Sequence, residues 1–191
     1  MIEHCYQPIP GWFYFAEAYT AAVTRAPSEK PSIFVELGCW RGRSTCFMVV
    51  EILRSTKPIT FYAIDTFNGS TEHREGIPEE LPDLFSSYCE NTAQLREIAP
   101  RSFFTLRGDS ALSAAGFKPE SVDFVFIDAE HTEEAVRRDI DAWWPKLKSG
   151  GVMGGDDYGL VGVRLAVLRS FSPNGNVYQP DGYPYWEVTK Q

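Results

Sequence analysis

Residues 32–45 read SIFVELGCWRGRST, and this stretch decides the fold. Its first half predicts a strand buried on both faces, through the apolar residues Ile33, Phe34, Val35 and Leu37. Gly38 and Gly42 then allow a tight turn and a close approach to a ligand. Arg43 or Ser44 opens a helix whose first N–H groups are free. This order predicts a small-molecule site at the carboxyl end of the first strand.

Length and composition indicate a single globular domain over residues 1–191, with residues 1–30 as an amino-terminal helix or lid region. The net charge of -8 disfavours nucleic acid or an anionic membrane as the main partner. No apolar run approaches the length of a membrane span, and no secretion signal opens the chain. The four cysteines show neither zinc-site nor disulfide spacing, so we expect a cytoplasmic protein.

Apolar periodicity predicts alternating helices and strands along the chain. Further strands are expected at 59–64, 102–106, 122–127, 152–155, 176–179 and 185–189, and helices at 11–25, 45–55, 83–98, 111–115, 132–147 and 160–171. The pattern specifies a doubly wound α/β sheet with helices on both faces and a final antiparallel hairpin. Helix 11–25 packs on the sheet edge, covers part of the pocket, or forms a homo-oligomer interface. Residues 70–82 are a lid or an insertion.

Acidic residues fall at or just after the carboxyl ends of all the strands that would run parallel, where such sheets bind ligands. Glu36 would be costly to bury without a partner. Asp65 suits the two hydroxyls of a ribose, or is a solvated turn residue. Asp109 is placed to accept from an adenine amino group, or to cap the following helix. Together these three acids suit a cofactor that contains a nucleoside.

The remaining acids, Asp128, Asp156 and Asp157, follow two neighbouring strands. Carboxylates this close repel one another unless a cation joins them, and oxygen ligands favour Mg²⁺, Ca²⁺ or Mn²⁺. Asp156 and Asp157 share a metal only if their strand has already ended, because successive strand residues point to opposite faces. The alternative is a pair of hydrogen-bonded turn acids without a metal.

His131 lies three residues after Asp128. A neutral imidazole at this position could accept a proton near neutral pH. The alternative is a helix-capping or surface histidine. His4 and His73 have no comparable setting.

The segments VELGCWRGRS, YAIDTF, LRGDS, VDFVFIDAEH and GGVMGGDDY, in this order, resemble class I S-adenosylmethionine-dependent methyltransferases. The pairing of IDAEH with GGDDY is similar to metal-dependent small-molecule O-methyltransferases, especially those that act on sugar hydroxyls of macrolide antibiotics. The resemblance implies a Rossmann-like seven-stranded sheet of order 3-2-1-4-5-7-6, with the last strand antiparallel.

The same resemblance implies the roles of individual residues. Glu36, Gly38 and Gly42 would line the methionine part of S-adenosylmethionine, Asp65 would bind the ribose and Asp109 the adenine. The expected cofactor site also includes Ser44, Thr66, Ser110 and Asp128. Asp128, Asp156 and Asp157 would hold Mg²⁺ or another hard divalent cation, and His131 would be the general base.

Two departures from these relatives matter. Catechol-type enzymes carry a lysine soon after the first metal acid, whereas Asp128 is followed by Ala129, Glu130 and His131. The macrolide enzymes have an additional amino-terminal region, whereas only residues 1–31 precede the first strand here. Lid residues would therefore come from helix 11–25, from residues 70–82 or from another subunit.

The sequence thus predicts methyl transfer from S-adenosylmethionine to a small-molecule hydroxyl, assisted by a divalent metal. The alternatives are a metal-independent methyltransferase of the same fold and a catalytically silent S-adenosylmethionine-binding module. A nicotinamide oxidoreductase is disfavoured because the glycine motif is E-x-G-x-x-x-G and not G-x-G-x-x-G.

Overall fold

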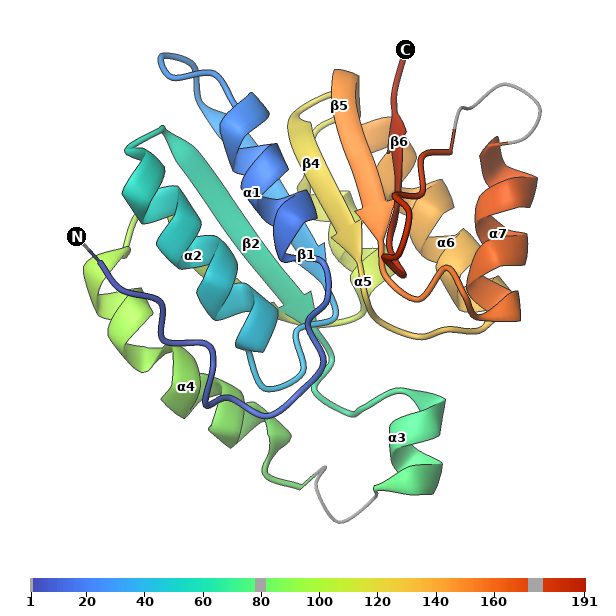
Figure 1. Ribbon diagram of the computed structural model, residues 1–191, viewed down its shortest axis with the longest axis horizontal. Helices are drawn as coiled ribbons and strands as arrows, with labels where there is room; N and C mark the ends of the chain where they lie inside the picture. Colours follow the sequence, from blue (N-terminus) through green and yellow to red (C-terminus); the bar gives the residue numbers. More distant parts are fainter. Residues whose placement is uncertain (1, 78–81, 172–176) are drawn as a thin grey trace.

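The centre of the fold is a sheet whose middle strands are apolar on both sides. The structure, a computed structural model, describes residues 2–77, 82–171 and 177–191. The strands are β1 (Ser32–Leu37), β2 (Ile59–Asp65), β3 (Phe103–Arg107), β4 (Val122–Ile127), β5 (Leu147–Gly155) and β6 (Trp186–Thr189). They are ordered β3-β2-β1-β4-β5-β6, and β6 pairs antiparallel to β5 (Figure 1).

Seven helices of the described residues connect and cover these strands. They are α1 (Ala16–Arg25), α2 (Arg43–Ser55), α3 (Thr71–Gly76), α4 (Leu84–Ile98), α5 (Ser110–Ser113), α6 (Glu133–Trp143) and α7 (Val161–Phe171), with 3₁₀ turns at Ala114–Gly116 and Trp144–Lys146. Helices α1, α2 and α4 cover one face of the sheet and α5, α6 and α7 the other (Figure 1).

The two faces carry separate apolar cores because strand residues alternate in direction. Phe34 and Phe124 pack under α1, α2 and α4, whereas Val35 and Val125 pack against the other helix layer. The described part of the chain contains no helix that is long and apolar enough to span a membrane. The mostly parallel sheet between two helix layers confirms the α/β fold predicted from the sequence.

The expected seven-stranded sheet is wrong for the described residues, which form six strands. Of the strand expected at 176–179, Asn176 lies outside the described residues. Tyr178 forms only an isolated antiparallel bridge with Glu187 on β6. The antiparallel pairing was predicted correctly, but one bridge does not extend into a strand.

Helix 11–25 is shorter than its apolar spacing predicts, because α1 begins at Ala16 and Trp12 is exposed. The helix lies over the middle of the sheet and not at its edge. The Tyr19 ring packs edge-on against Phe124 and Phe126 of β4, at centroid distances of 5.9 and 5.1 Å. The residues before α1 are thereby free to line the carboxyl edge of the sheet.

The helix expected at 132–147 also ends early, at Trp143. Pro145 explains the difference, because it lacks a backbone N–H and disfavours a continued α-helix. Leu147, the last residue of the expected helix, instead begins β5 and pairs with Val122.

Residues 70–82, expected to form a lid or an insertion, contain helix α3. Ser70 caps this helix together with His73, whose ring Nδ1 lies 3.2 Å from the Ser70 backbone nitrogen. Residues 78–81 of the expected lid or insertion lie outside the described residues. Helix α3 stands at the end of the molecule where the strands terminate (Figure 1).

Candidate active site

The turn after β1 depends on two glycines with left-handed backbone. Gly38 has a φ of +86°, and an added Cβ would lie 1.8 Å from the Asp128 carbonyl oxygen, so only glycine fits. Gly42 has a φ of +88° and caps α2, where a Cβ would lie 3.1 Å from Tyr88 and Thr92 side-chain atoms. The turn therefore packs directly against the residue that follows β4.

Asp65 at the end of β2 anchors the same turn. Its Oδ2 accepts the backbone N–H groups of Cys39 and Trp40 at 2.7 and 3.0 Å, and its Oδ1 accepts that of Phe67 at 2.7 Å. Burial raises the pKa of Asp65, and these hydrogen bonds oppose the rise. Because each carboxylate oxygen has two lone pairs, Asp65 retains capacity for a ligand hydroxyl.

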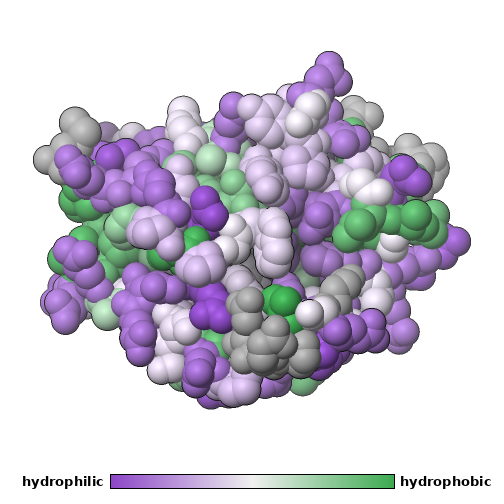
Figure 2. Space-filling model, turned by 60° about the horizontal axis from the view of Figure 1, so that its bottom comes forward, coloured by the Kyte–Doolittle hydropathy of each residue, from purple (hydrophilic) through white to green (hydrophobic). Residues whose placement is uncertain are grey.

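Two adjoining cavities lie at the carboxyl edge of the strands. The larger, of about 530 Å³, is lined by Ser44, His131, Asp156 and Asp157 among the expected site residues. The smaller, of about 220 Å³, is lined by Asp65, Thr66, Asp109 and Ser110. Their shared wall consists of Gly38, Trp40, His73, Asp128 and Ala129. Figure 2 shows the molecule with this edge of the sheet turned toward the viewer, and side chains of intermediate hydropathy lie in the middle of that face.

Glu36, which the sequence resemblance places at the methionine part of the cofactor, lies in the protein interior. It is 1% exposed and is not a lining residue of either cavity in the described part of the chain. Its carboxylate accepts the Tyr19 hydroxyl at 2.8 Å and the Thr45 hydroxyl. Burial raises the pKa of Glu36, and its hydrogen bonds oppose the rise. Glu36 thus joins α1 and α2 to β1; Gly42 is likewise absent from both linings.

Asp109 caps α5, one of its two expected roles. Its side chain accepts the Leu112 N–H at 2.9 Å and pairs with Arg138 at 2.8 Å. The neighbouring Ser110 hydroxyl donates to Asp139 at 2.5 Å. Both Asp109 and Ser110 line the smaller cavity, so contact with an adenine stays a prediction.

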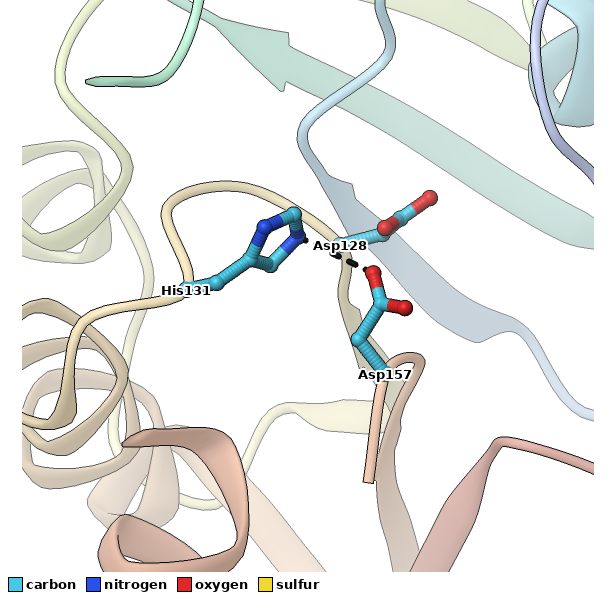
Figure 3. Close-up of side chains that lie close together, drawn as sticks. All are labelled: Asp128, His131 and Asp157. Atoms are coloured by element: carbon cyan, nitrogen blue, oxygen red, sulfur yellow. Dashed lines mark ion pairs between the residues drawn. The ribbon is translucent and has the colours of Figure 1, made fainter. Parts of the chain in front are cut away.

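The larger cavity contains a group of possible metal ligands. One ligand atom each of Asp128, His131 and Asp157 lies within 4.8 Å of the others. Figure 3 shows these side chains converging from the segment after β4 and the segment after β5. His131 Nε2 lies 3.1 Å from Asp157 Oδ2. Strand β5 ends at Gly155, and Asp157 has a φ of +56°. The strand has therefore ended before Asp156 and Asp157, which is the condition for these two acids to share a metal.

Asp156 lies beside this group without belonging to it. It is 6% exposed, and its Oδ1 is buried with no hydrogen-bond partner among the described residues. Burial raises the pKa of Asp156 to about 6. Burial, together with the charges of Asp156 and Asp157, also raises the pKa of Asp128 well above its usual value. These acids fit the expected cation. A bound cation would offset both the cost of burying the unpartnered Asp156 oxygen and the repulsion between the neighbouring carboxylates.

Residues 35–158 match the methyltransferase-domain family. The chain belongs to this family. It is therefore a methyltransferase, and the family implies S-adenosylmethionine as its cofactor.

Solved structures support the fold of this methyltransferase. The O-methyltransferase NovP is 17% identical with a TM-score of 0.69, over 92% of this chain and 79% of NovP. CalS11, a TDP-rhamnose 3′-O-methyltransferase of calicheamicin biosynthesis, is 16% identical with a TM-score of 0.62, over 91% and 76%. The S-adenosylhomocysteine-bound Podospora anserina methyltransferase PaMTH1 is 15% identical with a TM-score of 0.62, over 92% and 77%.

Several lining residues of the methyltransferase have no site role in the sequence-based prediction, among them Trp12, Tyr14, Trp40, Arg43 and His73. The His73 ring stacks on Trp40 at 4.1 Å and on Trp12 at 5.9 Å. The Ser70-x-x-His73 spacing resembles a capping box and could have predicted the start of the helix that positions His73. For Trp12 and Tyr14 the helical spacing was misleading, because it assigned them to a helix that begins later.

Proposed function

We propose that this methyltransferase methylates a hydroxyl group of a small molecule, with S-adenosylmethionine as methyl donor and a divalent cation as assistant. The convergence of Asp128, His131 and Asp157 in the larger cavity, beside the wall that it shares with the smaller one, supports this proposal most directly. In the reaction an O–CH₃ bond replaces the S–CH₃ bond, and the hydroxyl gives up its proton.

The two cavities suggest a division of the ligands. The smaller cavity would receive the nucleoside, with Asp65 at the ribose and Asp109 at the adenine. The shared wall around Gly38 and the end of the larger cavity at the start of α2 would receive the methionine part, and the rest of the larger cavity the acceptor. Acceptor and methyl group would then meet beside Asp128, so that much of the acceleration would come from positioning.

The cation would be held by Asp128 and Asp157, with a third ligand from His131 or Asp156. A divalent cation, when bound, lowers the pKa of a hydroxyl that it contacts. If Asp156 is the third ligand, as the sequence resemblance implies, His131 remains available to take the acceptor proton. Its 3.1 Å contact with Asp157 would then hold the imidazole at the mouth of the cavity.

The acceptor side of the larger cavity suits a small molecule with a flat or ring-shaped surface. Trp12 and Tyr14 line it and are 60% and 61% exposed, and Trp40 lies in its wall. Aromatic faces contact sugar and aromatic rings over a large area at little conformational cost. NovP and CalS11 are named as O-methyltransferases, and a sugar hydroxyl, as in CalS11, is the acceptor class we propose.

Calorimetric titration tests the metal and the cofactor separately. We expect S-adenosylhomocysteine to bind with Mg²⁺ or EDTA, and Mg²⁺ to give its own binding heat. Asp157→Asn should weaken Mg²⁺ binding at least about 10-fold, since it removes a ligand, while the matched change Asp141→Asn on the exposed side of α6 should not. Unchanged Mg²⁺ affinity in Asp157→Asn would refute this ligand set.

The same titrations choose the third ligand. If Asp156→Asn weakens Mg²⁺ binding and His131→Ala does not, while His131→Ala abolishes turnover, His131 is the base. The reverse pattern in metal affinity makes His131 a ligand.

A metal-independent methyltransferase is the second candidate, and the contact between His131 and Asp157 favours it. A carboxylate that orients a histidine suffices for general-base catalysis without a cation. Turnover that EDTA leaves unchanged, together with no Mg²⁺ heat in the unaltered protein, would select this candidate.

A further inference from the structure

Arg43 is the first residue of α2 and lines the larger cavity. Its Nη1 donates to the Gly11 carbonyl oxygen at 2.6 Å. Its Nε is buried and has no hydrogen-bond partner among the described residues. Arg43 as a whole is half-buried, and the ion pairs found among the described residues do not include it. A cation in this state lacks the negative partner that usually accompanies burial.

Other arginines of the described chain show the contrast. Each of five pairs with a carboxylate: Arg25, Arg54, Arg74, Arg138 and Arg169. Arg43 instead adds its charge to the positive amino end of the 13-residue helix α2. This end of the larger cavity therefore attracts an anionic group, and guanidinium N–H groups match the geometry of a carboxylate.

The same cavity also carries the opposite charge. Asp128, Asp156 and Asp157 form its acidic wall. The amino-acid end of S-adenosylmethionine carries a carboxylate, an ammonium group and a neighbouring sulfonium. A ligand of this kind matches a cavity with an arginine at the α2 end and carboxylates elsewhere, because each charge meets its opposite.

We propose that Arg43 binds the α-carboxylate of the methionine part of S-adenosylmethionine. This inference rests on the cofactor placement proposed above. The bond to Gly11 holds the guanidinium in place and ties the segment before α1 to the carboxylate pocket. That segment carries Trp12 and Tyr14, so occupation of the cofactor site would also steady the acceptor side of the cavity.

The test compares S-adenosylmethionine with decarboxylated S-adenosylmethionine, which keeps the nucleoside, the sulfonium and the amine but lacks the carboxylate. Calorimetry is performed on the unaltered protein, Arg43→Ala, Arg43→Lys and the control Arg137→Ala, which changes an exposed arginine of α6. The unaltered protein and the control should prefer the carboxylate ligand about 10- to 100-fold, as expected for charged hydrogen bonds.

In Arg43→Ala this preference should fall below about 3-fold, while affinity for the decarboxylated ligand stays the same; Arg43→Lys should keep part of the preference. Equal weakening of both ligands would mean that Arg43 only supports the fold through Gly11, and would overturn the inference. Unchanged preference would mean that Arg43 does not bind the carboxylate, and would also overturn the inference. If the unaltered, folded protein binds neither ligand, the proposed cofactor site fails as well.

Discussion

At the scale of single residues, the buried carboxylate of Glu36 shows how a polar group inside the sheet is satisfied. Its partners are hydroxyls of Tyr19 and Thr45, which come from helices on the same face of β1. Burial of a carboxylate is costly unless donors replace its water. The contact therefore makes Tyr19 a fixed point between α1 and the strand that leads to the glycine turn.

Removal of the Tyr19 hydroxyl should destabilise the protein. Tyr19→Phe leaves one Glu36 oxygen without this donor, so we expect the free energy of unfolding to fall by about 1–3 kcal/mol. Tyr14→Phe removes the same atom from an exposed ring and should change stability by less than about 0.5 kcal/mol. Urea unfolding followed by circular dichroism measures both, and equal stabilities for the two variants would contradict the role given to Tyr19.

At the scale of elements, α7 fixes the segment that carries His131. Gly162 lies in its first turn, and an added Cβ would be 2.4 Å from the His131 carbonyl oxygen and 3.0 Å from the Glu133 nitrogen. Helix and segment approach this closely only because that position has no side chain. The orientation of His131 toward Asp157 is thus partly a consequence of packing by α7.

Gly162→Ala should lower both stability and metal affinity. Alanine in a helix is ordinarily favourable by about 1 kcal/mol, whereas here the overlap with backbone should cost about 1–3 kcal/mol. Gly159→Ala, where a Cβ meets nothing within 4 Å, is the matched control. Thermal unfolding and Mg²⁺ titration compare the two variants. A Gly162→Ala protein that is more stable than the unaltered one would contradict this, because it would show that the His131 segment can move to accommodate the methyl group.

At the scale of the whole molecule, buried acids make stability depend on pH. Asp139 is 2% exposed, and its pKa is raised to about 6 by burial, which outweighs the Ser110 hydroxyl and Arg138; the charge of Asp109 adds to the rise. Between its unfolded value near 4 and about 6, the folded state holds a proton that the unfolded state releases. The contribution of Asp139 to stability is therefore lost as pH rises through this range.

Asp139→Asn should remove that loss. The amide still accepts from Ser110 but carries no charge, so the variant should gain up to about 3 kcal/mol over the unaltered protein at pH 8 relative to pH 4. Urea unfolding of both proteins at several pH values gives the difference, in which the other titrating groups cancel. A difference that does not change with pH would mean that folding does not raise the pKa of Asp139.

The α/β alternation, the parallel core and the end of the sheet where the site lies can all be predicted from the amino-acid sequence. Apolar runs such as 122–127 and the spacing of Gly38 and Gly42 carry that information locally, through strand burial and backbone sterics. Most of the site residues predicted from the sequence line the two cavities, among them Asp65, Asp128 and Asp157, because acids after parallel strands meet at one edge.

The contacts that these side chains make depend on how the elements pack, and the sequence pattern does not predict them. Glu36 bonds to Tyr19 and Thr45 because α1 lies over the middle of the sheet, a position that no local pattern encodes. His131 rather than Asp156 joins the closest group of possible ligands because Asp157 turns through left-handed backbone beside it. Arg43 and Trp12 meet in one cavity since a short, distant segment folds across the start of α2. Sequence spacing fixes periodicity within an element, whereas contacts between distant segments depend on how the elements pack.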